Sequence, residues 1–429
     1  MELSVEGYKS ISTKKTIKIG GLTILSGANS SGKSSFMQPF LILKQTIENH
    51  YDSEVLKIYG ENAKLTDSSQ IISKVPDYQK KSFSIYMKYE DNSCKLTYKY
   101  KRGHGLQIDS TNFKNKKFPD GLTLRYGMSS DYLDRMIKDD DFDFIKKFYE
   151  EKDGKAKWSV IRDKCFLMAE LFNSNEDFSP IRAGIDPSAH MEDFVTRLIH
   201  VPGLRGNPER IYKIASTENV FPGSFEKYVA SIISNWSKYK RNENKLKSLK
   251  EQLAELGLAG DIKTNKVDDT SVEINISRTK IGNNSDFVNI ADVGFGVSQT
   301  LPVLVALLCA KRGQCVYIEQ PEIHLHPKAQ FKLAAIIVSA IGRGVNVIIE
   351  THSSILIRGI QISVVNKSID NKLISLNWFT QDIKTGETNI SSTSPDDIGA
   401  YGDWPEDFDD TNLTVEQIYL DSIEERLYE

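Results

Sequence analysis

Hydrophobic and polar residues alternate at the start of the chain, and an apolar run and a helical pattern follow. The alternation within residues 1–19 predicts a β-hairpin, and the apolar run 22–25 predicts a buried strand. Residues 36–47 carry apolar side chains at helical spacing, so we expect a helix there. Pro39 falls in the early turns of that helix, where it should produce a kink.

The remaining chain changes its period several times. Residues 83–101 alternate strongly and predict a second hairpin, whereas the pattern from 129 to 257 is mostly helical. Residues 271–279 return to a strand pattern, and 287–376 predict a loop and then alternating helices and strands, with strands at 315–318, 346–349 and 372–378. We therefore expect an α/β core that both ends of the chain complete around a helical insertion.

The composition is that of a folded protein. The 429 residues are 39% hydrophobic and 26% charged, which suits two or three packing units and is too apolar for a disordered chain. The longest apolar run, 301–310, is about half of the ~20 residues that a membrane span needs, and the N-terminus has no apolar signal segment. Four scattered cysteines are too few for a disulfide framework or a zinc site. We expect a cytoplasmic protein with no membrane partner.

The charge is distributed unevenly. Residues 396–429 contain twelve acidic residues and one basic residue, a charge of −11, so the rest of the chain carries +8 within the total of −3. A basic body with an acidic tail suggests a surface for polyanions and a separate docking or shielding element. The alternative is a tail that only aids solubility, against which stand its large apolar side chains Tyr401, Trp404, Phe408, Ile418, Tyr419 and Leu427.

A glycine-rich loop between the strand at 22–25 and the following helix carries the strongest chemical signal. Its sequence fits the phosphate-binding pattern G-x-x-x-x-G-K-[ST], in the strand–loop–helix context that this pattern needs. The glycines let successive N–H groups face an anion, and the helix N-terminus adds partial positive charge. Lys33 is expected at the β- and γ-phosphates and the Ser34 hydroxyl on Mg²⁺, within a nucleotide-binding set of Gly27, Ala28, Asn29, Ser30, Ser31, Gly32, Lys33, Ser34 and Ser35.

A second element, at 315–319, is an apolar strand that ends in Glu319, which we expect to take the metal role. The next residue is Gln320. At this position many ATPases with such a loop carry the glutamate that activates water, whereas a glutamine can position water but cannot take its proton. Two readings stay open. Glu322 serves as the base if the turn brings it round, or hydrolysis is slow and ATP acts as a clamp. The pair His324 and His326 reads better as a contact with an opposite subunit than as a metal site.

Two further elements complete the set. Residues 292–299, DVGFGVSQ, form a second anion cradle at a helix start. His352 lies just past the strand at 346–349, where it can reach a γ-phosphate.

Together, these four elements resemble the ABC-type ATPases of the SMC, RecF and OLD clade, and most closely the PtuA ATPases of bacterial Septu defence systems. The resemblance covers residues 1–50 and 285–360, and the ending 402–408 resembles a tail of one branch of the clade. It implies a P-loop NTPase of the ABC-ATPase head type, with a mixed, largely parallel core sheet, an antiparallel β subdomain and a helical insertion. The expected boundaries are an N-terminal lobe, a helical insertion, a C-terminal lobe and an acidic tail, at 1–128, 129–262, 263–390 and 391–429.

The resemblance also implies the cofactors ATP and Mg²⁺ and a head-to-tail dimer that holds two ATP molecules, so we expect the chain to work as such a dimer or as a higher oligomer. His352 would act in cis, whereas Gly294, Gly296 and Ser298 would act in trans, in a signature that departs from the LSGGQ form. Gln70 is the candidate for the glutamine that senses Mg²⁺.

We find no nuclease, protease or HNH pattern, and no TOPRIM domain like that of OLD nucleases. A destructive output would therefore come from an effector encoded in trans, such as a nuclease in anti-phage defence. The alternatives are a DNA repair or maintenance ATPase that binds DNA itself, and a scaffold or antitoxin that restrains a partner. Two basic–aromatic clusters, at 95–117 and 236–247, are candidates for DNA contact or are simply exposed faces. The loop 201–210 either contacts an anion or shapes a turn.

Overall fold

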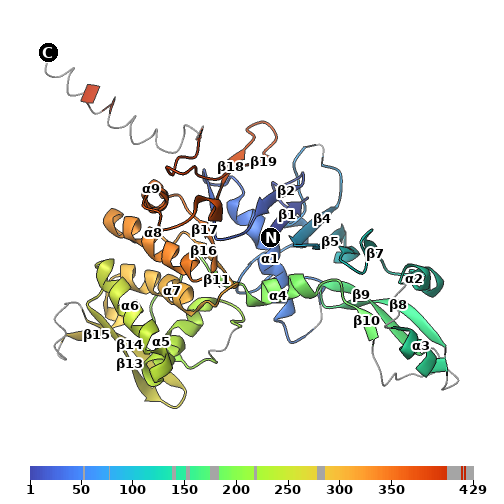
Figure 1. Ribbon diagram of the computed structural model, residues 1–429, viewed down its shortest axis with the longest axis horizontal. Helices are drawn as coiled ribbons and strands as arrows, with labels where there is room; N and C mark the ends of the chain where they lie inside the picture. Colours follow the sequence, from blue (N-terminus) through green and yellow to red (C-terminus); the bar gives the residue numbers. More distant parts are fainter. Residues whose placement is uncertain are drawn as a thin grey trace.

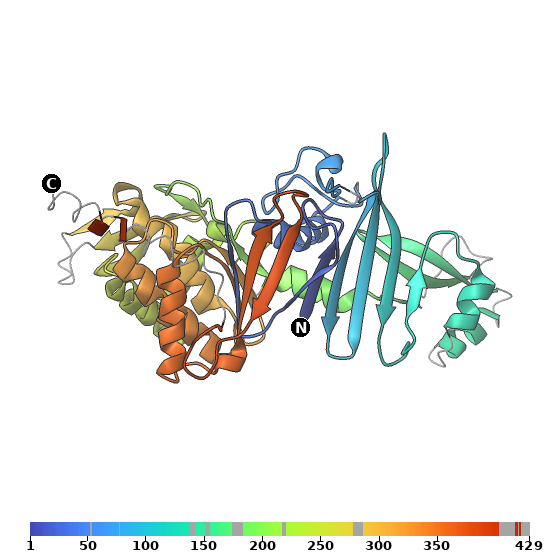
Figure 2. The same ribbon diagram turned by 90° about the horizontal axis from the view of Figure 1, so that it is seen from above.

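The computed structural model describes most of the chain, namely residues 1–51, 54–76, 78–137, 142–150, 155–173, 183–216, 220–277, 286–402, 417, 418, 420 and 421. The molecule is elongated, with an antiparallel β region at one end and helices packed together at the other (Figures 1 and 2). Most of the acidic tail lies outside the described residues, including Trp404, Phe408, Tyr419 and Leu427. Within the described part, no helix combines the length and apolar character that crossing a bilayer requires.

A six-stranded central sheet joins the two ends of the chain. Its strand order is β11 (Ile199–Val201), β16 (Cys315–Glu319), β17 (Asn346–Glu350), β3 (Leu22–Gly27), β18 (Ile374–Gln381) and β19 (Thr388–Thr393). All neighbouring pairs are parallel except β18 and β19. This confirms the α/β class and the largely parallel core sheet to which both ends contribute.

Helices cover both faces of the central sheet. On one face Ile24, Val316 and Val347 join a core with α7 (Phe295–Cys309), α8 (Pro327–Gly342) and α9 (Ser354–Val365). On the other face Tyr317 and Ile348 join a second core with α1 (Lys33–Ile47). Since successive side chains of a strand point to opposite faces, strands that are apolar throughout become buried on both sides.

The N-terminal lobe is an antiparallel sheet in which the two expected hairpins meet. Its order is β2 (Lys15–Lys18), β1 (Glu2–Glu6), β4 (Ser82–Tyr89), β5 (Asn92–Lys101), β6 (Gly105–Lys114) and β7 (Leu122–Leu124). The pairs β1–β2 and β4–β5 confirm both hairpins, and β1 also pairs with β4. This sheet is the expected antiparallel β subdomain.

The middle of the chain is less helical than its pattern predicts. It contains α2 (Ser130–Met136), α3 (Asp143–Glu150), α4 (Ala189–Arg197), α5 (Val229–Lys238) and α6 (Glu243–Glu255). It also contains the strands β8 (Ala156–Asp163), β9 (Phe166–Asn173) and β10 (Ala183–Ile185), which form a separate antiparallel sheet. The mostly helical expectation is therefore wrong over 156–173, where Trp158, Val160, Ala169 and Leu171 are buried with a period of two.

A fourth sheet lies beside α5 and α7 at the helical end of the molecule. It contains β12 (Tyr212–Lys213), β14 (Ser271–Ser277), β13 (Asp261–Asp268) and β15 (Phe287–Asn289). Strand β14 confirms the strand expected at 271–279. Short 3₁₀ helices precede α5 and α7, namely η3 (Phe225–Tyr228) and η5 (Ile290–Asp292). The first turns of α7 therefore lie where this sheet meets the central sheet.

Candidate nucleotide site

The glycine-rich loop leaves β3 and enters α1 in a conformation that needs its glycines. Gly27 has φ 140° and Gly32 has φ 100°, values that L side chains rarely adopt. A Cβ on Gly27 would lie 2.1 Å from the carbonyl oxygen of Phe379, and one on Gly32 would lie 2.3 Å from Oγ1 of Thr388. The hydroxyl of Thr388 also donates to the carbonyl of Ser31 at 2.8 Å. Strands β18 and β19 therefore press directly against the loop and hold its curved shape.

The two functional side chains after these glycines are already engaged. Lys33 is buried, and its Nζ donates to the carbonyls of Gly27 (3.0 Å) and Ala28 (2.7 Å) within the loop. Burial lowers the pKa of Lys33, although the charge of Glu350 opposes that shift. The Ser34 hydroxyl donates to Oε1 of Glu350 at 2.9 Å. The ammonium therefore lies inside the loop, and the serine faces a carboxylate.

Two carboxylates lie side by side at the ends of adjacent parallel strands. Glu319 ends β16, Glu350 ends β17, and the two residues pair in register. Glu350 also accepts a hydrogen bond from the Tyr317 hydroxyl at 3.1 Å. Burial and the neighbouring charge of Glu319 raise the pKa of Glu350. Sequence reasoning missed Glu350. The signal was present, because Glu350 ends an apolar strand as Glu319 does and lies two residues before His352.

A buried polar chain holds the carboxylate of Glu319. His200 contacts Glu319 through Nε2 at 3.1 Å and Asn62 through Nδ1 at 2.9 Å, and its ring stacks on Tyr317 at 5.3 Å between centroids. The backbone N–H of Gly203 donates to the other oxygen of Glu319 at 3.0 Å. Burial alone would raise the pKa of Glu319, but these bonds outweigh it and hold the pKa below its ordinary value. No local sequence motif marks His200 or Asn62, because folding alone brings them to Glu319.

The residues after Glu319 divide into two environments. Gln320 has φ 45°, and its N–H donates to the carbonyl of Glu350 at 2.7 Å. The carboxylate of Glu322 is buried and accepts from the Thr351 hydroxyl (2.8 Å) and from the N–H of His352 (2.9 Å). Burial raises the pKa of Glu322. Glu322 therefore holds the loop that carries His352.

His352 faces the cationic side of the loop. Burial and the charge of Lys33 lower the pKa of its imidazole. A lowered pKa favours the neutral ring, which has one donor and one acceptor nitrogen.

The two histidines after Glu322 contact protein groups. His324 lies 5.9 Å from Phe295 between ring centroids, and Nδ1 of His326 accepts from the N–H of Lys328 at the start of α8. Among the described residues, no group of three or more His, Cys, Asp and Glu side chains is placed to hold a metal ion.

The second anion cradle is the start of α7. Gly294 is the N-cap, has no side-chain cap bond and is exposed, and a Cβ there would meet nothing within 4 Å. Ser298 donates to the carbonyl of Phe295 at 3.2 Å, and Phe295 is 53% exposed. The first amides of a helix have no intrahelical partner. Gly294 is therefore open to solvent at the helix start, whereas Gly296 and Ser298 are partly buried, with Leu258 and the His324 carbonyl close to Gly296.

Arg205 connects the two parts of the site. Its guanidinium is buried and donates to the carbonyls of Glu319 (2.7 Å) and Gln299 (3.1 Å), and the Gln299 amide donates back to the carbonyl of Arg205 at 3.2 Å. Burial lowers the pKa of Arg205 to about 10. Arg210 pairs with Asp292 at 2.6 Å. The arginines of the loop 201–210 thus shape a turn and bind protein groups.

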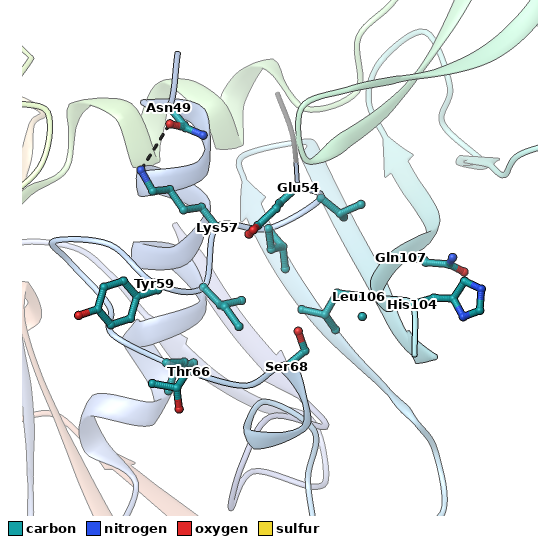
Figure 3. A pocket seen from close by; sticks show the side chains of 14 residues that line it. Asn49, Glu54, Lys57, Tyr59, Thr66, Ser68, His104, Leu106 and Gln107 are labelled. Carbon is teal, nitrogen blue, oxygen red and sulfur yellow. Dashed lines mark hydrogen bonds between the residues drawn. The ribbon is translucent and has the colours of Figure 1, made fainter. Parts of the chain in front are cut away.

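Gln70 is the remaining candidate of the metal set. It is exposed on η1 (Ser68–Gln70), and its amide donates to the Thr66 hydroxyl at 3.2 Å. A cavity of about 850 Å³ lies next to this segment, between residues 54–68 and the turn after β5 (Figure 3). The role of Gln70 as an Mg²⁺-sensing glutamine stays a prediction.

The fold and this site define a P-loop ATPase. The chain belongs to the AAA ATPase domain family, because the model of that family matches residues 1–357. ATP binding and ATPase activity follow from this membership, and Mg²⁺ generally accompanies ATP in such enzymes.

Solved structures with a similar course of the chain are heads of SMC proteins. An SMC head bound to the C-winged helix domain of ScpA is 12% identical, with a TM-score of 0.46 over 92% of this chain and 97% of that chain. The SMC head domain from Thermotoga maritima is 9% identical, with a TM-score of 0.38 over 91% and 97%. An SMC head with an extended coiled coil from Pyrococcus furiosus, bound to the C-terminal domain of ScpA, is 11% identical, with a TM-score of 0.42 over 92% and 96%. Comparison with curated protein sequences finds no match.

Proposed function

We propose that two copies of this ATPase close head to tail around ATP and that closure gates a separate effector, a nuclease encoded in trans, in anti-phage defence. The observation that carries the closure step is the contrast within the nucleotide site. On the P-loop side Lys33, Ser34 and Glu319 are hydrogen-bonded within the chain, whereas at the start of α7 Gly294 is exposed and the helix has no side-chain cap. Such a helix start suits an anion brought by a second copy.

The P-loop side fits ATP and its metal ion. Both glycines leave room only for backbone, so the loop amides form a cradle, and Lys33 lies beside them to reach phosphate oxygens. Ser34, Glu350 and Glu319 offer the oxygen donors that Mg²⁺ prefers. When bound, Mg²⁺ would neutralise phosphate charge at this point. Glu350 joins the expected metal set of Ser34, Glu319 and Gln70.

Hydrolysis is slow in this proposal because of Gln320. Its amide can orient a water molecule but cannot accept the proton of that water. Glu322 is already bonded to Thr351 and His352 and acts through them, by fixing the loop that places the imidazole. His352 then contacts the γ-phosphate as a neutral hydrogen-bond donor.

Closure would be transmitted through the turn that Arg205 fixes. Gly294, Gly296 and Ser298 of one copy would bind the γ-phosphate held by the other copy. Closure would therefore act directly on α7. Arg205 and Gln299 tie α7 to the end of β16. A change at either element therefore reaches the other, and the surface of the helical region is where an effector would sense it.

Direct DNA binding is the second candidate. Lys99, Lys101 and Arg102 are exposed on and beside β5, as a phosphate-binding surface requires. Other members of the two basic clusters are structural, since Lys95 pairs with Glu6 and Trp236 is buried under Lys245. A scaffold or antitoxin role differs from both in needing no output beyond restraint of a partner.

A pull-down of the tagged protein from its native host, with and without ATP·Mg²⁺, tests these functions. We expect a stoichiometric partner with nuclease chemistry whose recovery depends on nucleotide, identified by mass spectrometry and native mass. A homo-oligomer recovered only with DNA would contradict effector gating and favour repair. Salt-sensitive binding of DNA by the purified protein would point the same way.

A further inference from the structure

A second cavity lies beside the start of α7. Residues of the glycine-rich loop do not line it, but Arg205 and Ser298 of the site described above do. The cavity measures about 440 Å³ and is enclosed by the loop after β11, the region around η3, strand β14 and the first turns of α7. Its floor is apolar, because Ile274, Ile290 and Leu301 are each 1% exposed. Tyr212 and Tyr228, both half-buried, supply two aromatic rings to its walls. Its size and mixed lining are those of a small-molecule site.

One buried donor in the wall of this cavity has no partner. The guanidinium of Arg205 is 7% exposed and lines the cavity, and its Nε–H makes no hydrogen bond although both Nη atoms do. A buried donor left without an acceptor is costly, and native proteins rarely leave one unexplained. Arg205 therefore contributes a fixed guanidinium to the cavity wall, next to a buried N–H that has no acceptor.

Helix α7 contributes polar backbone to the same cavity. Pro302 stands inside the helix and has no N–H, so the carbonyl of Ser298 loses the bond that residue 302 would otherwise donate. Ser298 and Pro302 both line the cavity, one helical turn apart, so this gap in the helix hydrogen bonds lies beside the cavity. The polar residues Arg205 and Ser298 thus accompany aromatic and aliphatic walls.

We propose that this cavity is a regulatory site for a planar heteroaromatic ligand of nucleoside size. A nucleobase carries acceptor and donor atoms along its edge, and its faces stack on aromatic rings. The ligand would touch Arg205, which holds the end of β16, and Ser298, which belongs to the expected signature. It would therefore bias the arrangement of α7 relative to the P-loop side. Its effect on closure rests on the proposed function, whereas binding itself does not.

Binding is tested on the full chain with adenosine, guanosine, cytidine, uridine and free adenine, by ligand-observed NMR and calorimetry. These probes lack phosphates, so Lys33→Ala should leave their affinity unchanged. We expect at least one probe to bind, and Ala215→Trp, which fills the cavity, to weaken it by at least about 10-fold. The matched control is Ile214→Trp, because Ile214 is exposed and does not line the cavity. Should Ala215→Trp fail to fold, Tyr212→Leu removes one stacking ring and should weaken binding at least about 3-fold.

Two results would overturn the site: no binding by any probe, or equal binding by the Ala215→Trp and Ile214→Trp proteins. Coupling is measured separately, as the ATPγS concentration that half-dimerises the protein with and without the bound probe. We expect a shift of at least about 3-fold. Probe binding without this shift overturns the regulatory role. Probe binding in a protein that never dimerises with ATPγS instead contradicts the proposed closure and leaves the site standing.

Discussion

The two sides of the nucleotide site differ in how far the chain completes them. On the P-loop side, Ser34, Glu350 and Glu319 belong to a hydrogen-bonded network that extends to the buried side chains of Tyr317 and His200. At the start of α7, Gly294 is exposed and its helix has no side-chain cap. Buried polar groups need hydrogen-bond partners within the protein, whereas the first amides of a helix can bind water or a ligand instead. In the proposed closure, the chain itself completes one side of the site and a second copy completes the other.

The largest expected effect comes from breaking the prepared side. Lys33→Ala removes the ammonium that lies at the loop carbonyls, so we expect ATP affinity to fall by at least about 100-fold. Calorimetry with ATPγS·Mg²⁺ measures the change. Lys328→Ala, at an exposed lysine in the first turn of α8, is the matched control and should bind normally. Wild-type affinity in the Lys33→Ala protein would show that nucleotide binds elsewhere.

Blocking the open side should separate binding from closure. Ser298→Arg places a bulky cation at the expected interface, so we expect dimerisation with ATPγS to weaken at least about 30-fold while the monomer still binds nucleotide. Light scattering during gel filtration reports the dimer. Ser237→Arg makes the same exchange at an exposed position of α5 and should leave dimerisation intact. Normal dimerisation of Ser298→Arg would place the interface on another face.

Restoring a proton acceptor should accelerate turnover. The wild-type rate is expected below ~1 s⁻¹, near the low end of ordinary enzymes. Gln320→Glu supplies the missing base, so we expect steady-state hydrolysis to rise by at least about 10-fold. Gln107→Glu, at an exposed position of β6, controls for the added charge. A fast wild-type enzyme would rule out this explanation of Gln320.

Glu322→Gln decides between the two expectations for this residue. The glutamine carbonyl can still accept from Thr351 and from the amide of His352, so we expect turnover to change by less than about 3-fold. Loss of a general base would instead lower the rate by roughly 100-fold or more. Steady-state assays of both proteins at saturating ATP distinguish these outcomes.

The smallest effect concerns the paired carboxylates. Because the pKa of Glu350 is raised on folding, the folded state holds that proton more tightly, and stability falls as pH rises from the unfolded pKa through the folded one. The glutamine of Glu350→Gln does not ionise, so this variant does not lose stability in that way as pH rises. We expect its melting temperature, without nucleotide, to exceed that of the wild type by about 2 °C at pH 8 and by less at pH 5. Glu255→Gln, at an exposed position of α6, should show no such trend, and a pH-independent difference would contradict the ionisation argument.

Much of the fold was predictable because its core strands are local patterns. The apolar run 22–25 and those at 315–318 and 346–349 became β3, β16 and β17, since a strand buried on both faces must be apolar throughout. The middle of the chain was harder. The strands at 156–163 and 166–173 lie among amphipathic helices, and their alternation became decisive only once one face packed against the N-terminal lobe.

The sequence by itself determined the chemistry of single positions: a loop that only glycine can form, a lysine and a serine after it, and acids at the ends of apolar strands. These follow from spacing along one chain, which a motif records directly. The tertiary structure alone decided which acid faces Ser34, that His200 and Asn62 hold Glu319, and that Arg205 and Pro302 open onto a shared cavity. Those contacts join residues over a hundred positions apart or on different elements, and only the packing of the sheets brings them within hydrogen-bond distance.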